Sequence, residues 1–366
     1  MLPIFVIINT LLRENCYNSQ EDAWWLNMVE TLAVPFESSD ILIIVEKLRK
    51  MYGETVQMTM LGNLAEPYPI LRVGKRAVRG LPVSDSRLRY FEPIPFRGRV
   101  AAVDASIKVL FDLGTAKIVE SKVAAGVWRG FEREFMLGPV KRLALIEDKR
   151  EAGEWLLRLE LEFALRISHR LSYGDYLLLD RGLLCPPFLK SSTRRIFEKL
   201  DRTMASKGGV LVGVVKRSGM SLNTGESVVG YVASLAESRL PGVAWYYHPL
   251  FKESALPGWV LGDISIVKFS ELSDAAFRVD ISWSSLAARD LERIIGELGF
   301  IQDLATPGYP YPLKAVHDMS LISEHEVDLD RFRLLDRLLK EGFEGKLRAD
   351  MKVSTFKERY FWGSLG

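Results

Sequence analysis

Residues 99–128 read RVAAVDASIKVLFDLGTAKIVESKVAAGVW, and this stretch decides the fold class. Apolar and β-branched residues dominate it, and Gly114 with Thr115 supplies a turn inside it. These features predict three strands: Arg99–Val103, which ends at Asp104, then Ile107–Phe111 and Lys117–Trp128. Strands joined by such short connections pair with their sequence neighbours in antiparallel fashion. We therefore expect an antiparallel meander here.

Helices and strands alternate after this meander. The spacing of apolar residues predicts a long helix from about Glu151 to Leu171, and then a strand at Tyr176–Leu179. A basic helix and a strand at Val210–Val215 follow. Further strands are expected at Ala244–Tyr247, Val260–Phe269 and Phe277–Trp283, and further helices at Ala288–Leu298, Leu313–His325 and Asp328–Leu339. This order predicts an α/β fold with a mixed β-sheet flanked by helices.

The first 95 residues differ from the rest of the chain. They contain a predicted helix at Ser39–Tyr52 and then a proline-rich run. We assign no chemistry to them and interpret residues 1–95 as an N-terminal extension with a structural or interface role. The main domain is then predicted at residues 96–345, and a C-terminal tail at residues 346–366.

Composition narrows the class of protein. With 366 residues, of which 48% are hydrophobic and 26% charged, the chain can bury a sizeable core. Its apolar runs are too short to span a bilayer and its N-terminus lacks the basic start of a signal peptide, which predicts a cytoplasmic location. Cys16 and Cys185 are too few and too isolated for a disulfide framework or a zinc site. The net charge of only +2 means that any DNA contact must come from local charge.

Two aspartates follow apolar strands and are the most informative residues. Asp104 ends the run Arg-Val-Ala-Ala-Val-Asp, and Asp180 ends the run Tyr-Leu-Leu-Leu-Asp. Ligands of open α/β sheets gather at strand ends, so two such acids on neighbouring strands are placed to share a metal ion. The alternative for either residue alone is that its side chain caps the following turn or helix.

The helix between these strands supplies a third acid. A helical wheel places Glu160 in the middle of the apolar face and Glu162 on the polar face. A carboxylate that points into the core needs a cation, and a metal shared with Asp104 and Asp180 meets that need. The alternative for Glu160 is a helix in a slightly different register. Glu162 is expected to pair with Arg166 one turn later.

A turn rich in proline and glycine, Pro307–Leu313, leads into a predicted helix that carries His317. The neutral imidazole of His317 is a good ligand for Mn²⁺ when carboxylates complete the coordination shell. Tyr309, within the turn, is the candidate for positioning a phosphate or a metal-bound water. A lone histidine is more often structural, which is the alternative for His317.

Basic residues lie where a phosphate would bind. Lys216 follows the strand Val210–Val215, on the side where Asp180 ends its own strand, and is placed to neutralise a phosphate. The helix after Asp180 carries a basic run that is suited to follow a DNA backbone: Lys190, Arg194, Arg195, Lys199 and Arg202. The alternative is a solvated helix face, since two acids dilute the run.

In order and spacing, these segments resemble the NurA nucleases from about residue 97 to 325. The resemblance rests on Asp104 in Val-Asp-Ala-Ser, the helical glutamate, Asp180 in Leu-Leu-Leu-Asp-Arg-Gly-Leu, Lys216 in Val-Val-Lys-Arg-Ser, and Gly-Tyr-Pro-Tyr-Pro-Leu before His317. It implies an RNase H-like core and a Mn²⁺-dependent single-strand endonuclease and 5′–3′ exonuclease that acts on single-stranded DNA and DNA ends. It also implies a homodimer that works with the hexameric HerA translocase, an ATPase, in DNA end resection and double-strand break repair.

The chain departs from the family pattern at two positions. The family commonly has glycine after each of the two aspartates, whereas this chain has Ala105 and Arg181. Alanine is a small change. The guanidinium of Arg181 is a larger one, because it can pair with Asp180 or with a substrate phosphate.

The predicted reaction is metal-assisted phosphodiester hydrolysis. Two Mn²⁺ ions, with Mg²⁺ as the alternative, are expected on four ligands: Asp104, Glu160, Asp180 and His317. Lys216 would stabilise charge on the phosphoryl group. The alternative function is a non-catalytic DNA-clamping or adaptor subunit of the same translocase complex. A phosphotransferase on the same core is disfavoured because the sequence lacks the P-loop pattern.

Overall fold

The structure, a computed structural model, describes residues 38–52, 66–303 and 305–343. The chain divides into two compact units, residues 1–56 and 57–366. In the first unit the described part is helix α3 (Ser38–Tyr52), where the sequence predicts a helix at Ser39–Tyr52. The predicted C-terminal tail, residues 346–366, lies outside the described residues.

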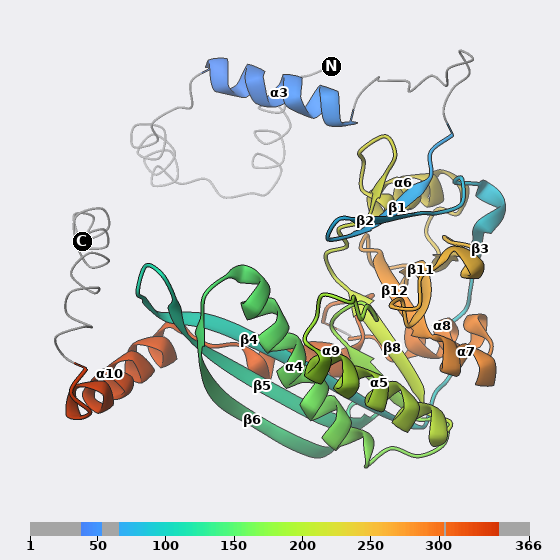
Figure 1. Cartoon of the computed structure of the whole chain (residues 1–366). Coiled ribbons are helices and arrows are strands. Elements are labelled where there is room, and N and C mark those ends of the chain that lie inside the picture. The colour runs from blue at the N-terminus through green and yellow to red at the C-terminus, as the bar shows by residue number, and fades with distance from the viewer. Residues whose placement is uncertain (1–37, 53–65, 304, 344–366) are drawn as a thin grey trace, which may run out of the picture. The chain divides into compact units, whose positions relative to one another are not determined.

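A large β-sheet is the centre of the second unit (Figure 1). Over the described residues it has nine strands in the order β3-β10-β11-β12-β8-β7-β4-β5-β6. Strand β5 pairs antiparallel with β4 and β6, whereas β7 and β8 run parallel to β4. The order β6-β5-β4-β7-β8 with these directions is the RNase H-like arrangement, so the predicted α/β fold class is confirmed. The bounds of these five strands are Arg99–Asp112 (β4), Lys117–Arg129 (β5), Glu132–Ile146 (β6), Tyr176–Leu179 (β7) and Val210–Val215 (β8).

The meander differs from its prediction in two ways. Residues 99–112 form one continuous strand, where the sequence predicts two, because Asp104, Ser106 and Lys108 share one face of a strand whose pairing with β5 continues past them. Strand β6 was not predicted. It forms the edge of the sheet and is mostly exposed and rich in charge, which hides the apolar alternation on which strand prediction relies.

The other strands extend the sheet and build a second one. In the large sheet, β12 is antiparallel to β8, β11 to β12 and β10 to β11, and β3 pairs with β10. The described residues also form a three-stranded sheet in the order β2-β1-β9. Their bounds are Pro69–Val73 (β1), Arg76–Arg79 (β2), Leu88–Tyr90 (β3), Ser221–Leu222 (β9), Trp245–Tyr247 (β10), Gly262–Lys268 (β11) and Phe277–Ser282 (β12).

Helices cover both faces of the large sheet. Their bounds are Lys149–Ser168 (α4), Ser191–Ser206 (α5), Val228–Arg239 (α6), Trp283–Ala288 (α7), Leu291–Phe300 (α8), Tyr311–Ser320 (α9) and Glu324–Lys340 (α10). The predicted helix Leu313–His325 is split, because Ser323 caps the start of α10 and forms a capping box with Glu326. None of the described helices combines the length and hydropathy that a membrane crossing requires.

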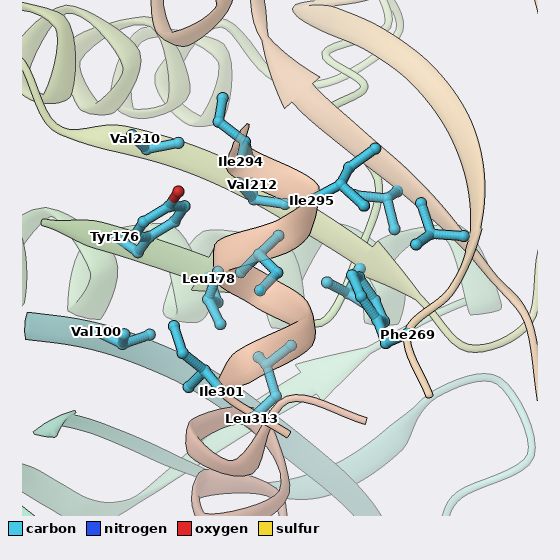
Figure 2. Close-up of a cluster of buried hydrophobic side chains, with 14 of the residues drawn as sticks. Val100, Tyr176, Leu178, Val210, Val212, Phe269, Ile294, Ile295, Ile301 and Leu313 are labelled. Carbon is cyan, nitrogen blue, oxygen red and sulfur yellow. The ribbon is translucent and has the colours of Figure 1, made fainter. Parts of the chain in front are cut away.

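Alternate residues of the central strands enter two different cores. Val100, Tyr176 and Leu178 pack with residues of α8 and α9, a cluster that Figure 2 shows. Their neighbours along the strands, such as Val103 and Leu179, pack against α4 and α5 on the opposite face. Because strand side chains alternate with a period of two, the face that a residue at the end of a strand occupies follows from its position.

Candidate metal centre

Asp104 and Asp180 lie side by side where the parallel ladder of β4 and β7 ends. The last pair in that ladder is Val103 with Leu179, and the two aspartates come next on each strand. Asp104 does not end its own strand as predicted, because β4 continues in antiparallel pairing with β5, where Asp104 is opposite Ala124. The two acids are nevertheless neighbours, as the sequence predicts.

Both aspartates point to the face of the sheet that α9 covers. Each lies two residues after a side chain of the core beneath that helix, Ala102 on β4 and Leu178 on β7. His317 on α9 completes the group, with its Nδ1 2.8 Å from Oδ2 of Asp104. One potential ligand atom from each of the three residues lies within 4.8 Å of the other two.

This group suits a hard divalent cation. Carboxylate oxygens and an imidazole nitrogen are the donors that Mn²⁺ accepts, and Mg²⁺ also binds carboxylates. Asp104 is only 6% exposed, and Oγ of Ser320 donates a hydrogen bond of 2.9 Å to the same Oδ2 that His317 contacts. Ser320 therefore orients the carboxylate, as partners of a metal ligand commonly do. The residues fit a metal ion bound by Asp104, Asp180 and His317.

Lys216 and Tyr309 lie beside this group, as the sequence predicts. Nζ of Lys216 is 2.8 Å from Oδ2 of Asp180 and 4.7 Å from the centre of the Tyr309 ring. Tyr309 is 4% exposed, and its hydroxyl group makes no hydrogen bond of proper geometry to another described residue. Burial and then the charge of Asp180 raise the pKa of Tyr309 above its usual range. The hydroxyl therefore keeps its proton and can donate a hydrogen bond to a ligand oxygen.

Glu160 is buried as the helical wheel predicts, with 3% of its surface exposed, but it has a different partner. The guanidinium of Arg181 contacts both of its carboxylate oxygens, through Nε and, at 2.6 Å, through Nη2. Burial raises the pKa of Glu160 from 4.5 to about 7, with Arg181 opposing that rise and the charges of Asp104 and Asp180 adding to it. Helix α4, which carries Glu160, covers the face of the sheet opposite α9. A role for Glu160 as a metal ligand stays a prediction.

Glu162 lies on the exposed side of α4, as predicted, but it pairs with Arg158 and not with Arg166. Nε of Arg158 is 2.9 Å from a carboxylate oxygen of Glu162. The pair spans one turn toward the N-terminus of the helix, and spacings of four residues in either direction bring side chains together.

A buried ion pair that was not predicted from the sequence holds the loop after Asp180. Both carboxylate oxygens of Asp280 accept hydrogen bonds from Arg278, each 2.7 Å long, and both residues are almost fully buried. Oδ2 of Asp280 also accepts a hydrogen bond of 2.9 Å from the backbone N–H of Leu183. An arginine and an aspartate two positions apart in a strand share one face, which was the available signal.

Gly213 allows the loop to lie against the sheet. A Cβ atom at this position of β8 would lie 2.1 Å from the backbone oxygen of Arg181, far inside contact distance. We expect Gly213→Ala to lower the free energy of unfolding by about 1–3 kcal/mol, the usual cost of overpacking. Urea denaturation measures this change.

Gly153 provides the matched control for that substitution. It lies in α4, and a Cβ atom there meets nothing within 4 Å. Gly153→Ala should therefore stabilise the chain by about 0.5–1 kcal/mol, since alanine lowers the entropy cost of a helix. An equal effect of the two substitutions would contradict the close approach at Gly213.

Three of the predicted basic residues of α5 lie on its exposed side. Arg195, Lys199 and Arg202 are exposed, and Nε of Arg195 and of Arg202 each donates to a backbone oxygen one turn earlier. Lys190, just before the helix, lies 3.6 Å from Glu151. A contact between this face and DNA stays a prediction.

Solved structures of nucleases are similar to this chain. The NurA nuclease from Sulfolobus solfataricus has 14% identity and a TM-score of 0.49, over 70% of this chain and 89% of that one. A NurA structure bound to dAMP and manganese has 10% identity and a TM-score of 0.42, over 64% and 87%. The catalytic domain of human endonuclease V has 14% identity and a TM-score of 0.35, over 64% and 89%. No protein-family model matches the chain, and no curated protein matches it in sequence.

Proposed function

We propose that the chain is a metal-dependent DNA nuclease of the NurA type. The observation that carries this proposal is the meeting of Asp104, Asp180 and His317, which come from three separate segments of the sequence. Two neighbouring carboxylates in a largely buried place repel each other and lose hydration, and Lys216 offsets the charge of Asp180. A divalent cation would offset the negative charge that remains.

The surrounding residues suit hydrolysis of a phosphodiester bond. A bound divalent ion supplies Lewis acidity and lowers the pKa of water. Lys216 carries a positive charge and pairs with Asp180. When DNA binds, the lysine would leave Asp180 and neutralise a phosphate oxygen. The hydroxyl group of Tyr309 is protonated and buried, and it meets the criteria for a hydrogen bond with no other described residue. It would donate a hydrogen bond to a phosphate oxygen. Ser320 and His317 hold the carboxylate of Asp104 in one orientation.

The finer assignments follow from the motif resemblance. We propose Mn²⁺ as the preferred ion, with Mg²⁺ as the alternative, single-strand endonuclease and 5′–3′ exonuclease activity, and a cytoplasmic location. We also propose a homodimer that acts with a HerA-type hexameric ATPase in DNA end resection and double-strand break repair. The NurA structure solved with dAMP and manganese is in keeping with a metal-dependent action on DNA.

Cleavage assays test this function directly. End-labelled single- and double-stranded DNA is incubated with the full chain in Mn²⁺, Mg²⁺ or EDTA, and the products are separated on a denaturing gel. We expect shortened products in Mn²⁺, and none in EDTA because the carboxylates then hold no cation. DNA binding without cleavage in either metal would overturn the proposal and favour the adaptor subunit.

A further inference from the structure

Arg181 is the feature that sets this centre apart from a simple cluster of carboxylates. It follows Asp180 directly, and it contacts Glu160 on α4 whereas Asp180 lies with His317 of α9. Its guanidinium contacts both oxygens of Glu160, with Nη2 2.6 Å from Oε1. Glu160 is 3% exposed, whereas the side chain of Arg181 keeps 26% of its surface exposed. The guanidinium thus lies against the buried carboxylate of Glu160, next to the residue that follows β7, Asp180.

This pairing makes Glu160 a poor ligand for a metal ion. Each of its oxygens meets one nitrogen of the guanidinium, and such two-point pairs are among the strongest charged hydrogen bonds. A cation bound to the same carboxylate would lie beside the positive charge of Arg181, and like charges repel each other. Moving Arg181 away would in turn leave a charge in a largely buried place without its partner, which costs several kcal/mol.

The balance of charge points the same way. Asp104, Asp180 and Glu160 carry at most three negative charges, and Lys216 and Arg181 offset two of them. One divalent cation more than neutralises the remainder. A second would leave a surplus of positive charge in a largely buried place before any substrate phosphate arrives, which is unfavourable.

We propose that Arg181 takes the place of a second metal ion, so that the centre binds one divalent cation per chain through Asp104, Asp180 and His317. This inference rests on the proposed metal-dependent function and deepens it. Arg181 is a positioning residue, because it acts by holding Glu160 away from the cation. This proposal has one ion where the sequence predicts two.

Counting bound Mn²⁺ tests the inference without any measurement of activity. Free Mn²⁺ is followed by electron paramagnetic resonance as the full chain is titrated, and we expect one tight ion per chain. Arg181→Gly frees Glu160, so this variant should bind two ions. Its affinity for the second ion should be at least ten times the affinity of the unaltered chain for any second ion. The double variant Arg181→Gly/Glu160→Gln should return to one ion.

Two further variants keep the inference open to refutation. Arg181→Lys preserves the positive charge and should still bind one ion. Arg181→Gln removes the charge but keeps hydrogen-bond donors, and it should bind two ions. This variant replaces Arg181→Gly if circular dichroism shows that the glycine variant does not fold. Two ions of similar affinity on the unaltered chain, or a single ion on both uncharged variants, would overturn the inference while leaving the proposed function intact. Absence of any Mn²⁺ binding by the unaltered chain would instead overturn the metal centre itself.

Discussion

Asp104→Asn should lower the rate of DNA cleavage in saturating Mn²⁺ by about a thousandfold or more, a loss of about 4 kcal/mol in transition-state stabilisation. Asparagine has nearly the same shape but no charge, so the oxygen that meets His317 and Ser320 becomes a weak metal ligand. Asp180 is then the one carboxylate left among the three ligand residues. Single-turnover cleavage of end-labelled single-stranded DNA measures the effect.

Asp318→Asn is the matched control for this substitution. Asp318 neighbours His317 on α9, but it faces solvent and pairs with Lys314 one turn earlier. We expect its cleavage rate to stay within about twofold of the unaltered chain, because an exposed pair of this kind contributes little. Full activity of the Asp104 variant, or an equal loss in both variants, would contradict the assignment of Asp104 to the metal centre.

The parts of the fold that were predicted correctly have strong local signals. Residues 176–179 and 210–215 are unbroken apolar runs between turn-forming residues, which is typical of strands buried on both faces, and both form strands at the predicted bounds. Strand β6 at Glu132–Ile146 lies at the edge of the sheet and exposes most of its side chains, so its sequence lacks that signal. Its place in the sheet is set by pairing with β5, a long-range interaction.

The part of the candidate centre that depends on strand register was predictable from the sequence. Asp104 and Asp180 follow apolar runs that pair in parallel, so their proximity follows from the sequence alone once the strands are aligned. The partner of Glu160 was not predictable in the same way. A helical wheel shows that Glu160 faces inward, but which cation meets it depends on how α4 lies on the sheet, and the loop after β7 supplies Arg181.

Arg278→Met should lower the free energy of unfolding by about 3–5 kcal/mol, because it leaves a buried charge without its partner. Methionine removes both hydrogen bonds to Asp280 and leaves that carboxylate charged or forced to take up a proton in a place with no solvent exposure. Urea denaturation at neutral pH measures the loss. The cleavage rate should fall as well, since Asp280 holds the backbone of Leu183 in the loop that follows Asp180.

Two comparisons separate the buried charge from a general effect of losing an arginine. Arg293→Met removes an arginine that is 62% exposed, and its partner Glu297 keeps Arg289 at 2.7 Å, so the cost should stay below about 1 kcal/mol. The double variant Arg278→Met/Asp280→Leu removes both charges, and only the N–H of Leu183 loses its partner, which costs about 1–3 kcal/mol. It should therefore unfold at a higher urea concentration than Arg278→Met alone. If the double variant is the less stable of the two, the pair contributes through its own attraction, and the account based on an unpaired Asp280 is wrong.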